Sequence, residues 1–156
     1  MGAAASMSDR HANRLRHFAL ALFCMGAAGT GAELLLLGHT ESTPQFIPLV
    51  ALGLGIIAAV AAAARPAPAV LRSFQALMAG LVVTGPVGLY LHYRGNVEFE
   101  LEMYPSLKGL DLVWKALTGA TPALAPGAMI LLGLMGLAST YRHPALSRPT
   151  TAGESR

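Results

Sequence analysis

Four apolar segments dominate the chain, and each is close to the length needed to cross a bilayer. They cover residues 18–37, 46–64, 73–91 and 122–140. A transmembrane helix needs about 20 mainly apolar residues, because the hydrocarbon core of a bilayer is about 30 Å thick. The second and fourth segments contain no charged residue, and Glu33 is the only one in the first. The pattern predicts an all-α, polytopic membrane protein with four transmembrane helices.

The composition supports this interpretation and excludes several other classes. Of the 156 residues, 54% are hydrophobic and 12% are charged, whereas a typical globular domain has about 25% charged residues. An ordinary soluble enzyme, a disordered chain and a nucleic-acid-binding domain are therefore excluded. The single cysteine, Cys24, leaves no pair for an internal disulfide or a thiol oxidoreductase. The sequence contains no nucleophile–base motif, phosphate loop or nucleotide fingerprint, so we expect no enzymatic activity and no cofactor.

Basic residues are distributed unevenly between the predicted loops. Eight of the eleven Lys and Arg residues lie in the N-terminal tail, the 65–72 loop or the C-terminal tail. The positive-inside rule then places both termini in the cytoplasm. We expect a cytoplasmic tail over 1–15, a transmembrane domain over 16–143 and a second cytoplasmic tail over 144–156. The predicted location is the inner (plasma) membrane of a bacterium.

The 92–121 connection is the only long segment predicted outside the membrane. Residues 98–103 alternate strictly between acidic and apolar, which is typical of an extended strand with one side exposed to solvent. A helical face follows, formed by Leu107, Leu110, Val113, Trp114 and Leu117. This pattern predicts an amphipathic helix in the membrane interface that covers the outer end of the bundle.

Small residues mark the expected packing faces, because they let helix backbones approach closely within lipid. On the first segment they are Gly26, Gly29 and Thr30, and on the third they are Gly80, Thr84, Gly85 and Gly88. We expect these two segments to be in intimate contact.

A cluster of titratable residues lies at the predicted outer end. Glu33 and His92 continue the two small-residue faces, and His39, Arg94, Glu98 and Glu102 are nearby in the sequence. One hypothesis is structural, in which Glu33 pairs with Arg94 or His92 and locks two helices together. The other is an ion or proton site, since carboxylates within membranes are functional candidates. No metal-binding spacing is present, so we expect no metal, and a haem between His39 and His92 is a weaker alternative.

The run from Gly109 to Pro144, which contains the sequence TPALAPG, resembles small uncharacterised bacterial four-span integral membrane proteins. The resemblance implies no function. From the residues alone we expect a non-enzymatic accessory or scaffold subunit of a membrane complex. The alternative is a small oligomeric transporter or proton-coupled carrier that uses Glu33. The expected partners are the lipid bilayer and other membrane proteins or further copies of the chain, and no nucleic acid.

Overall fold

The computed structural model describes residues 2–119, 121–122 and 124–147. Over these residues the regular elements are six helices: α1 (Gly2–Leu36), α2 (Thr43–Ala64), α3 (Pro68–Met103), α4 (Gly109–Leu117), α5 (Gly127–Ser139) and α6 (Pro144–Ser147). The all-α prediction is confirmed. Three helices are long and apolar enough to cross a membrane, namely α1 over Arg10–Leu36, α2 and α3.

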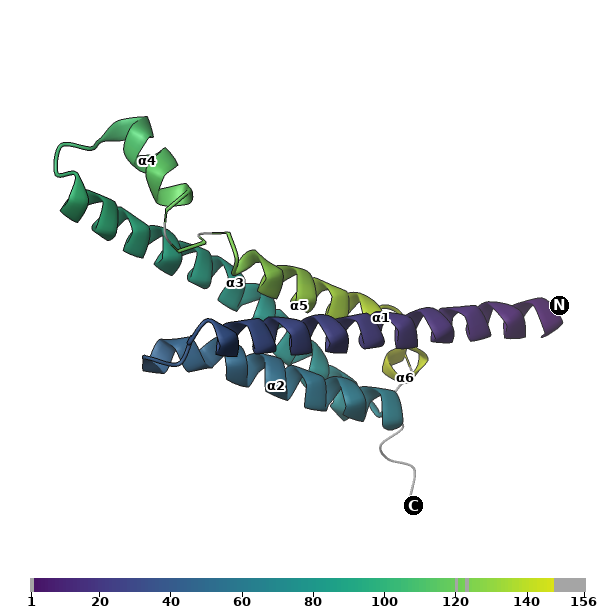
Figure 1. Ribbon diagram of the computed structural model, residues 1–156. Coiled ribbons are helices and arrows are strands. Elements are labelled where there is room, and N and C mark those ends of the chain that lie inside the picture. Colours follow the sequence, from purple (N-terminus) through teal and green to yellow (C-terminus); the bar gives the residue numbers. More distant parts are fainter. Residues whose placement is uncertain (1, 120, 123, 148–156) are drawn as a thin grey trace, which may run out of the picture.

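Four of these helices form a bundle in which each packs against two neighbours. α3 packs most extensively on α5, α5 also packs on α1, and α2 packs on both α1 and α3 (Figure 1). α1 and α3 therefore lie on a diagonal of the bundle. The predicted intimate contact between the first and third apolar segments is wrong, because α2 and α5 lie between them.

Large side chains, and not small ones, join α1 to α3 across this diagonal. The rings of Phe23 and Phe74 meet edge to face, with their centroids 6.0 Å apart and an interplanar angle of 87°. Both are fully buried, together with Met78 from α3 and Leu52 from α2. Aromatic pairs prefer this geometry, because the positive ring edge faces the negative ring face. The bundle centre is thus a packed apolar core.

The predicted packing glycines divide into those that meet α5 and those that meet nothing. A Cβ atom on Gly26 would lie 2.8 Å from Leu132, and one on Gly88 would lie 2.7 Å from Pro126. A Cβ on Gly85 would overlap Ile130. In contrast, Gly29 and Gly80 face open space, and the Thr84 hydroxyl donates a hydrogen bond to its own helix, at Leu81 O. Gly26, Gly85 and Gly88 thus face α5 or the residue that precedes it, and the small residues of the two helices do not face each other.

Glycines of α5 complete the closest contact in the bundle. A Cβ on Gly133 would lie 2.6 Å from the backbone oxygen of Met78 and 2.9 Å from the backbone nitrogen of Val82. A Cβ on Gly136 would overlap the Met78 side chain. α5 therefore approaches the α3 backbone as closely as its glycines permit.

Local signals in the sequence set the turn between α1 and α2. Gly38 has a φ of +65°, and the hydrogen bonds from Gly38 N–H to Leu35 O and from His39 N–H to Leu34 O form a Schellman motif. The next helix begins where the Gln45 side chain accepts a hydrogen bond from the Ser42 N–H. Gly38 thus ends α1 and fixes the position of His39.

α3 continues well beyond the bundle. Its 36 residues span about 54 Å at 1.5 Å per residue, and Figure 1 shows its last turns extending away from the other long helices, with α4 folded back against them. The strand expected over 98–103 is instead the end of this helix. Its alternating pattern was misleading, because Arg94 and Glu98, four residues apart, form an ion pair that suits a helix.

Candidate functional site

The outer-end cluster predicted from the sequence is brought together only in part. Glu33 is exposed on the last turn of α1, and its carboxylate forms no ion pair or hydrogen bond with the residues that the structure describes. The predicted pairing of Glu33 with His92 or Arg94 is therefore not formed. The reason is the diagonal placement of α1 and α3, which keeps the two predicted faces apart.

His39 and His92 do meet at this end. Their ring centroids are 6.2 Å apart, and Nδ1 of His92 lies 3.2 Å from Pro122 O, so His92 also contacts the segment leading into α5. Desolvation lowers the pKa of His39, and the positive form of His92 lowers it further. Both effects favour the neutral imidazole of His39, which suits a packing contact between the α1–α2 turn and α3.

The other predicted residues of the cluster belong to α3 alone. Arg94 Nε donates to Glu98 Oε1 at 2.8 Å, and both side chains are mostly exposed. Glu102 is exposed one turn further on. An exposed pair at this spacing contributes little to stability, because solvent screens it. These residues therefore lie on the exposed surface of α3 beyond the bundle and do not form one site with Glu33.

The α3–α4 hairpin, defined here as residues 92–119, is held by a buried amide that the sequence analysis did not single out. Asn96 is only 3% exposed. Its Nδ2 donates to Ala116 O at 2.8 Å and to Thr121 O at 2.6 Å, while its Oδ1 accepts from the Thr121 N–H. A buried amide with all these partners is a strong local constraint. The only signal in the sequence was a lone amide next to Gly95.

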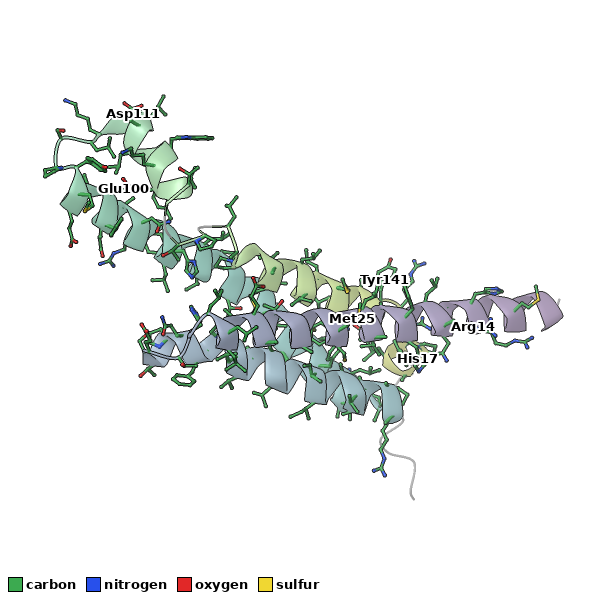
Figure 2. The ribbon with its side chains drawn as sticks, viewed as in Figure 1. Arg14, His17, Met25, Glu100, Asp111 and Tyr141 are labelled. Atoms are coloured by element: carbon green, nitrogen blue, oxygen red, sulfur yellow. The ribbon has the colours of Figure 1, made fainter. Side chains whose placement is uncertain are left out.

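A second set of contacts joins the two helices nearer the tip of the hairpin. Lys115 Nζ lies 3.8 Å from Glu100 Oε2 and 3.8 Å from the centre of the Tyr104 ring. Figure 2 places Glu100 on α3 and Asp111 at the outer side of α4. Because residue 116 meets residue 96 while 115 meets 100, α4 runs antiparallel to α3.

Four large apolar residues of α4 face away from α3. Leu110 is 84% exposed and Trp114 is 69% exposed, and Val113 and Leu117 are also exposed. These four residues, which we call the apolar stripe, share one helical face because they are spaced three and four residues apart. The side of α4 that packs against α3 is formed by the fully buried Ala116 and the half-buried Leu112. The expected cover over the outer end of the bundle is wrong, because α4 packs on α3.

Among the described residues, this end offers an exposed apolar surface and no grouped metal ligands. Among the residues that the structure describes, no three His, Cys, Asp or Glu side chains are grouped to hold a metal ion. The hairpin instead presents a rigid exposed surface with a tryptophan at its centre. Comparisons of the chain with protein-family models, with curated proteins and with solved structures find no match.

Proposed function

We propose that this chain is a four-span accessory subunit of a membrane complex, with both termini in the cytoplasm and the apolar stripe of α4 as its contact with a partner protein. The observation that carries the proposal is the α3–α4 hairpin. It is built on a helix that continues out of the bundle, and it exposes large apolar side chains that no described residue covers.

The fourth span is supported by helical turns that flank α5. α5 has 13 residues and is only about 20 Å long. On its N-terminal side, i to i+3 hydrogen bonds link Pro122 to Ala125 and Leu124 to Gly127, and another follows the helix from Leu137 to Thr140. Such tighter turns rise about 2 Å per residue. The segment from 122 to 140 is then about 30 Å long, which matches a bilayer core.

The orientation is supported by the clustering of basic segments at one end of the bundle. The stretch of α1 around Arg16, the turn between α2 and α3 and the residues after α5 lie together, and α1 continues beyond them toward the N-terminus (Figure 1). The Arg16 guanidinium donates a hydrogen bond to Arg142 O across this end. Arg65, directly after α2, and Arg72, near the start of α3, lie at the same end of the bundle. These segments carry the basic excess that marks a cytoplasmic face.

A protein partner accounts for the hairpin better than a lipid surface does. An amphipathic helix bound to a membrane lies flat in the interface, so that its whole apolar face is at one depth. α4 instead runs along α3, which leaves the bundle beyond residue 91. The stretch of α3 from Asn96 to Met103 is about 7 to 18 Å further along the helix from that boundary. The stripe beside it is thus inclined away from the membrane.

A central tryptophan surrounded by aliphatic residues is also typical of protein interfaces. Trp is enriched among the residues that contribute most binding energy, and such residues lie near the centre of the contact. Exposed apolar patches on a folded surface commonly mark interaction sites.

The carrier alternative receives no support from a specific observation. A proton-coupled carrier using Glu33 would need a polar route between the helices. Among the described residues of the bundle, Phe23, Phe74 and Met78 fill the centre, and the buried polar Ser139 and Thr140 lie at the basic end.

The experiment is purification of the tagged chain from its native membrane in a mild detergent. We expect one polypeptide to co-purify in stoichiometric amount with the wild-type chain. The double variant Leu110→Ser/Trp114→Ala should lose it, while Asp111→Asn, on the same short helix but outside the stripe, should retain it. Retention of the same polypeptide by the double variant, or recovery of the chain as a homodimer alone, would contradict the proposal.

Topology needs a separate measurement. Reporter fusions after residues 42 and 105 should report the extracytoplasmic side, and fusions after 68 and 156 should report the cytoplasm. An extracytoplasmic signal at 68 or 156 would overturn the orientation.

A further inference from the structure

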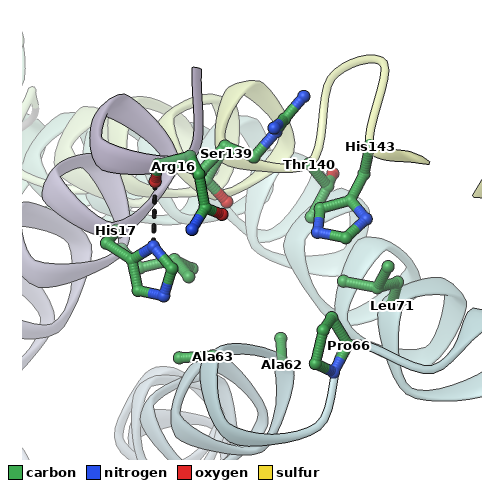
Figure 3. Close-up of a pocket in the computed structure, with 11 residues that line it drawn as sticks. Arg16, His17, Ala62, Ala63, Pro66, Leu71, Ser139, Thr140 and His143 are labelled. Carbon is green, nitrogen blue, oxygen red and sulfur yellow. Dashed lines mark hydrogen bonds between the residues drawn. The ribbon is translucent and has the colours of Figure 1, made fainter. Parts of the chain in front are cut away.

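A small cavity with mostly apolar walls and polar side chains around it lies at the basic end of the bundle, opposite the hairpin. Its volume is about 40 Å³, which is room for roughly three water-sized atoms at about 10–15 Å³ each. Figure 3 shows His17 from α1 and His143 from the turn after α5 on opposite sides of the opening, above the apolar floor that includes Leu71. Four chain segments thus converge on a space large enough for a small polar group.

The polar groups around this cavity are basic or neutral. Arg16, His17, His143 and Asn13 line it, and none of its eleven described lining residues is acidic. Arg16 uses one N–H to bond Arg142 O at 3.0 Å, which holds the guanidinium at the rim and leaves its other N–H groups to donate. Positive groups therefore converge without a counter-charge among the lining residues.

Hydrogen bonds to Nδ1 fix the orientation of both imidazoles. Nδ1 of His143 accepts from the Ala145 N–H, so its Nε2 carries the proton of the neutral ring and can donate. Nδ1 of His17 bonds to Asn13 O at 2.8 Å, so its Nε2 becomes a donor when the ring is protonated. Desolvation, followed by the charges of Arg16 and His17, lowers the pKa of His143. A bound anion would relieve that repulsion.

The cavity also lies at the depth where lipid headgroups would be. Its walls come from residues 13–20, 62–66, 71 and 139–143, beside the predicted membrane boundaries at residues 18, 64, 73 and 140. We propose that this cavity binds the phosphodiester group of an anionic phospholipid through Arg16, His17 and His143. Basic pockets between transmembrane helices on the cytoplasmic side bind such headgroups, and guanidinium groups are well suited to phosphate oxygens.

This inference rests on the membrane boundaries of the proposed function, but it is independent of the partner at the hairpin. The two can fail separately, because the reporter fusions test the boundaries and a binding titration in detergent tests the site. If the fusions place the basic end outside the cytoplasm while phospholipid still binds, the orientation fails and the site stands.

The test is calorimetric titration of the delipidated full chain in dodecylmaltoside. The probes are dioctanoyl-phosphatidylglycerol, dioctanoyl-phosphatidylcholine and glycerophosphoglycerol, which is the first headgroup without acyl chains. We expect phosphatidylglycerol to bind more tightly than phosphatidylcholine. Binding of the headgroup alone with equal affinity would assign the site to a free phosphodiester and overturn the lipid source.

Variants separate this site from general attraction to the basic surface. Arg16→Gln and His143→Gln should each weaken binding of phosphatidylglycerol about tenfold. Arg16→Gln removes the charge-assisted guanidinium donor, and His143→Gln removes the imidazole Nε2 donor. Arg14→Gln, an equal loss of charge on the exposed side of the same helix, should change the affinity by less than about twofold. Arg16→Gln also loses the hydrogen bond to Arg142 O. If this variant has a lower melting temperature, the affinities of His17→Gln and His143→Gln for phosphatidylglycerol decide the test.

The pH dependence gives a further readout. The phosphodiester keeps its single negative charge between pH 6.0 and 7.5, so any change reports protonation of the protein. Binding should be at least about threefold tighter at pH 6.0, because the anion favours the protonated imidazole of His143, and His143→Gln should abolish that change. Equal affinities for both phospholipids, or unchanged affinity in Arg16→Gln and His143→Gln, would overturn the proposal.

Discussion

The two halves of α3 are held by different physical means. Over residues 68–91 the helix is packed between α2 and α5, with the α5 glycines against its backbone and Phe74, Met78 and Leu81 fully buried. Over residues 92–103 it packs on α4. Polar contacts join the two beside the apolar Ala116: Asn96 donates to two backbone carbonyls, and Glu100 pairs with Lys115. The first half has the close small-residue packing that membranes favour, whereas the second resembles a solvated hairpin.

This difference indicates what each half contributes. The packed half leaves little freedom for side chains to change, so it maintains the fold. The hairpin is held by a few polar contacts and its apolar stripe is exposed, so it is the part that we propose binds a partner. Substitutions should therefore act on stability in the first half and on binding in the second.

The largest loss of stability is expected from Gly133→Ala. The new Cβ would lie 2.6 Å from Met78 O and 2.9 Å from Val82 N, and backbone cannot move aside as a side chain can. Overpacking of this kind costs about 1–3 kcal/mol, measured as the change in free energy of unfolding in mixed micelles. Gly80→Ala, where nothing lies within 4 Å, is the matched control and should stabilise α3 by about 0.5–1 kcal/mol. Equal effects of the two substitutions would contradict the close contact.

Next in size is Asn96→Ala, whose effect should be confined to the hairpin. The change leaves Ala116 O and Thr121 O without their buried donor, which costs about 1–3 kcal/mol. Hydrogen exchange should accelerate across α4 and the residues following it, while α1, α2 and α5 keep their protection. Glu98→Gln, which removes only an exposed ion pair, is the control and should leave exchange in α4 unchanged. Uniform acceleration along the whole chain would show that the hairpin is not a separate unit.

A smaller effect is expected from acidification at the basic end of the packed half. The pKa of His143 is lowered by desolvation and by the charges of Arg16 and His17. A group with a folded pKa below its unfolded value, near 6.5, stabilises the fold above that value and loses the contribution as the pH falls. The melting temperature without anionic lipid should therefore fall between pH 7.5 and 5.5. His143→Gln should reduce this fall, whereas the exposed His11→Gln should leave it intact.

The smallest effect on stability is expected from Trp114→Ala. The indole is mostly exposed, and surface substitutions usually change the free energy of unfolding by less than about 0.5 kcal/mol. Thermal unfolding of the purified chain should thus be unchanged, even though partner binding is lost. A clear drop in melting temperature would mean that the stripe is part of the fold.

The sequence predicted helix positions well and helix partners poorly. The second predicted span, 46–64, begins only three residues after the helix start at Thr43, because an uninterrupted apolar run needs no partner to be recognised. Gly26, Gly85 and Gly88 likewise marked real contacts, but nothing within one helix states which neighbour it meets. α5 occupies both faces, so Glu33 and His92 do not meet as predicted.

The hairpin was harder to predict for a different reason. Six alternating residues, 98–103, fit a strand by period alone, and the helix over them depends on contacts with a segment 15 or more residues away. The decisive side chain, Asn96, is a single amide whose burial becomes evident only when Ala116 and Thr121 are placed beside it. The apolar spacing of α4 did indicate a helix, although it did not reveal which side of that helix packs.

Photocrosslinking in the native membrane tests the contrast between the two halves most directly. Benzoylphenylalanine would replace Trp114 on the stripe in one variant and Val87, an exposed residue in the packed half of α3, in another. The account predicts that position 114 yields a protein adduct of one defined mass and that position 87 yields lipid adducts. Lipid adducts alone at position 114, as at position 87, would contradict the assignment of the hairpin to a partner protein.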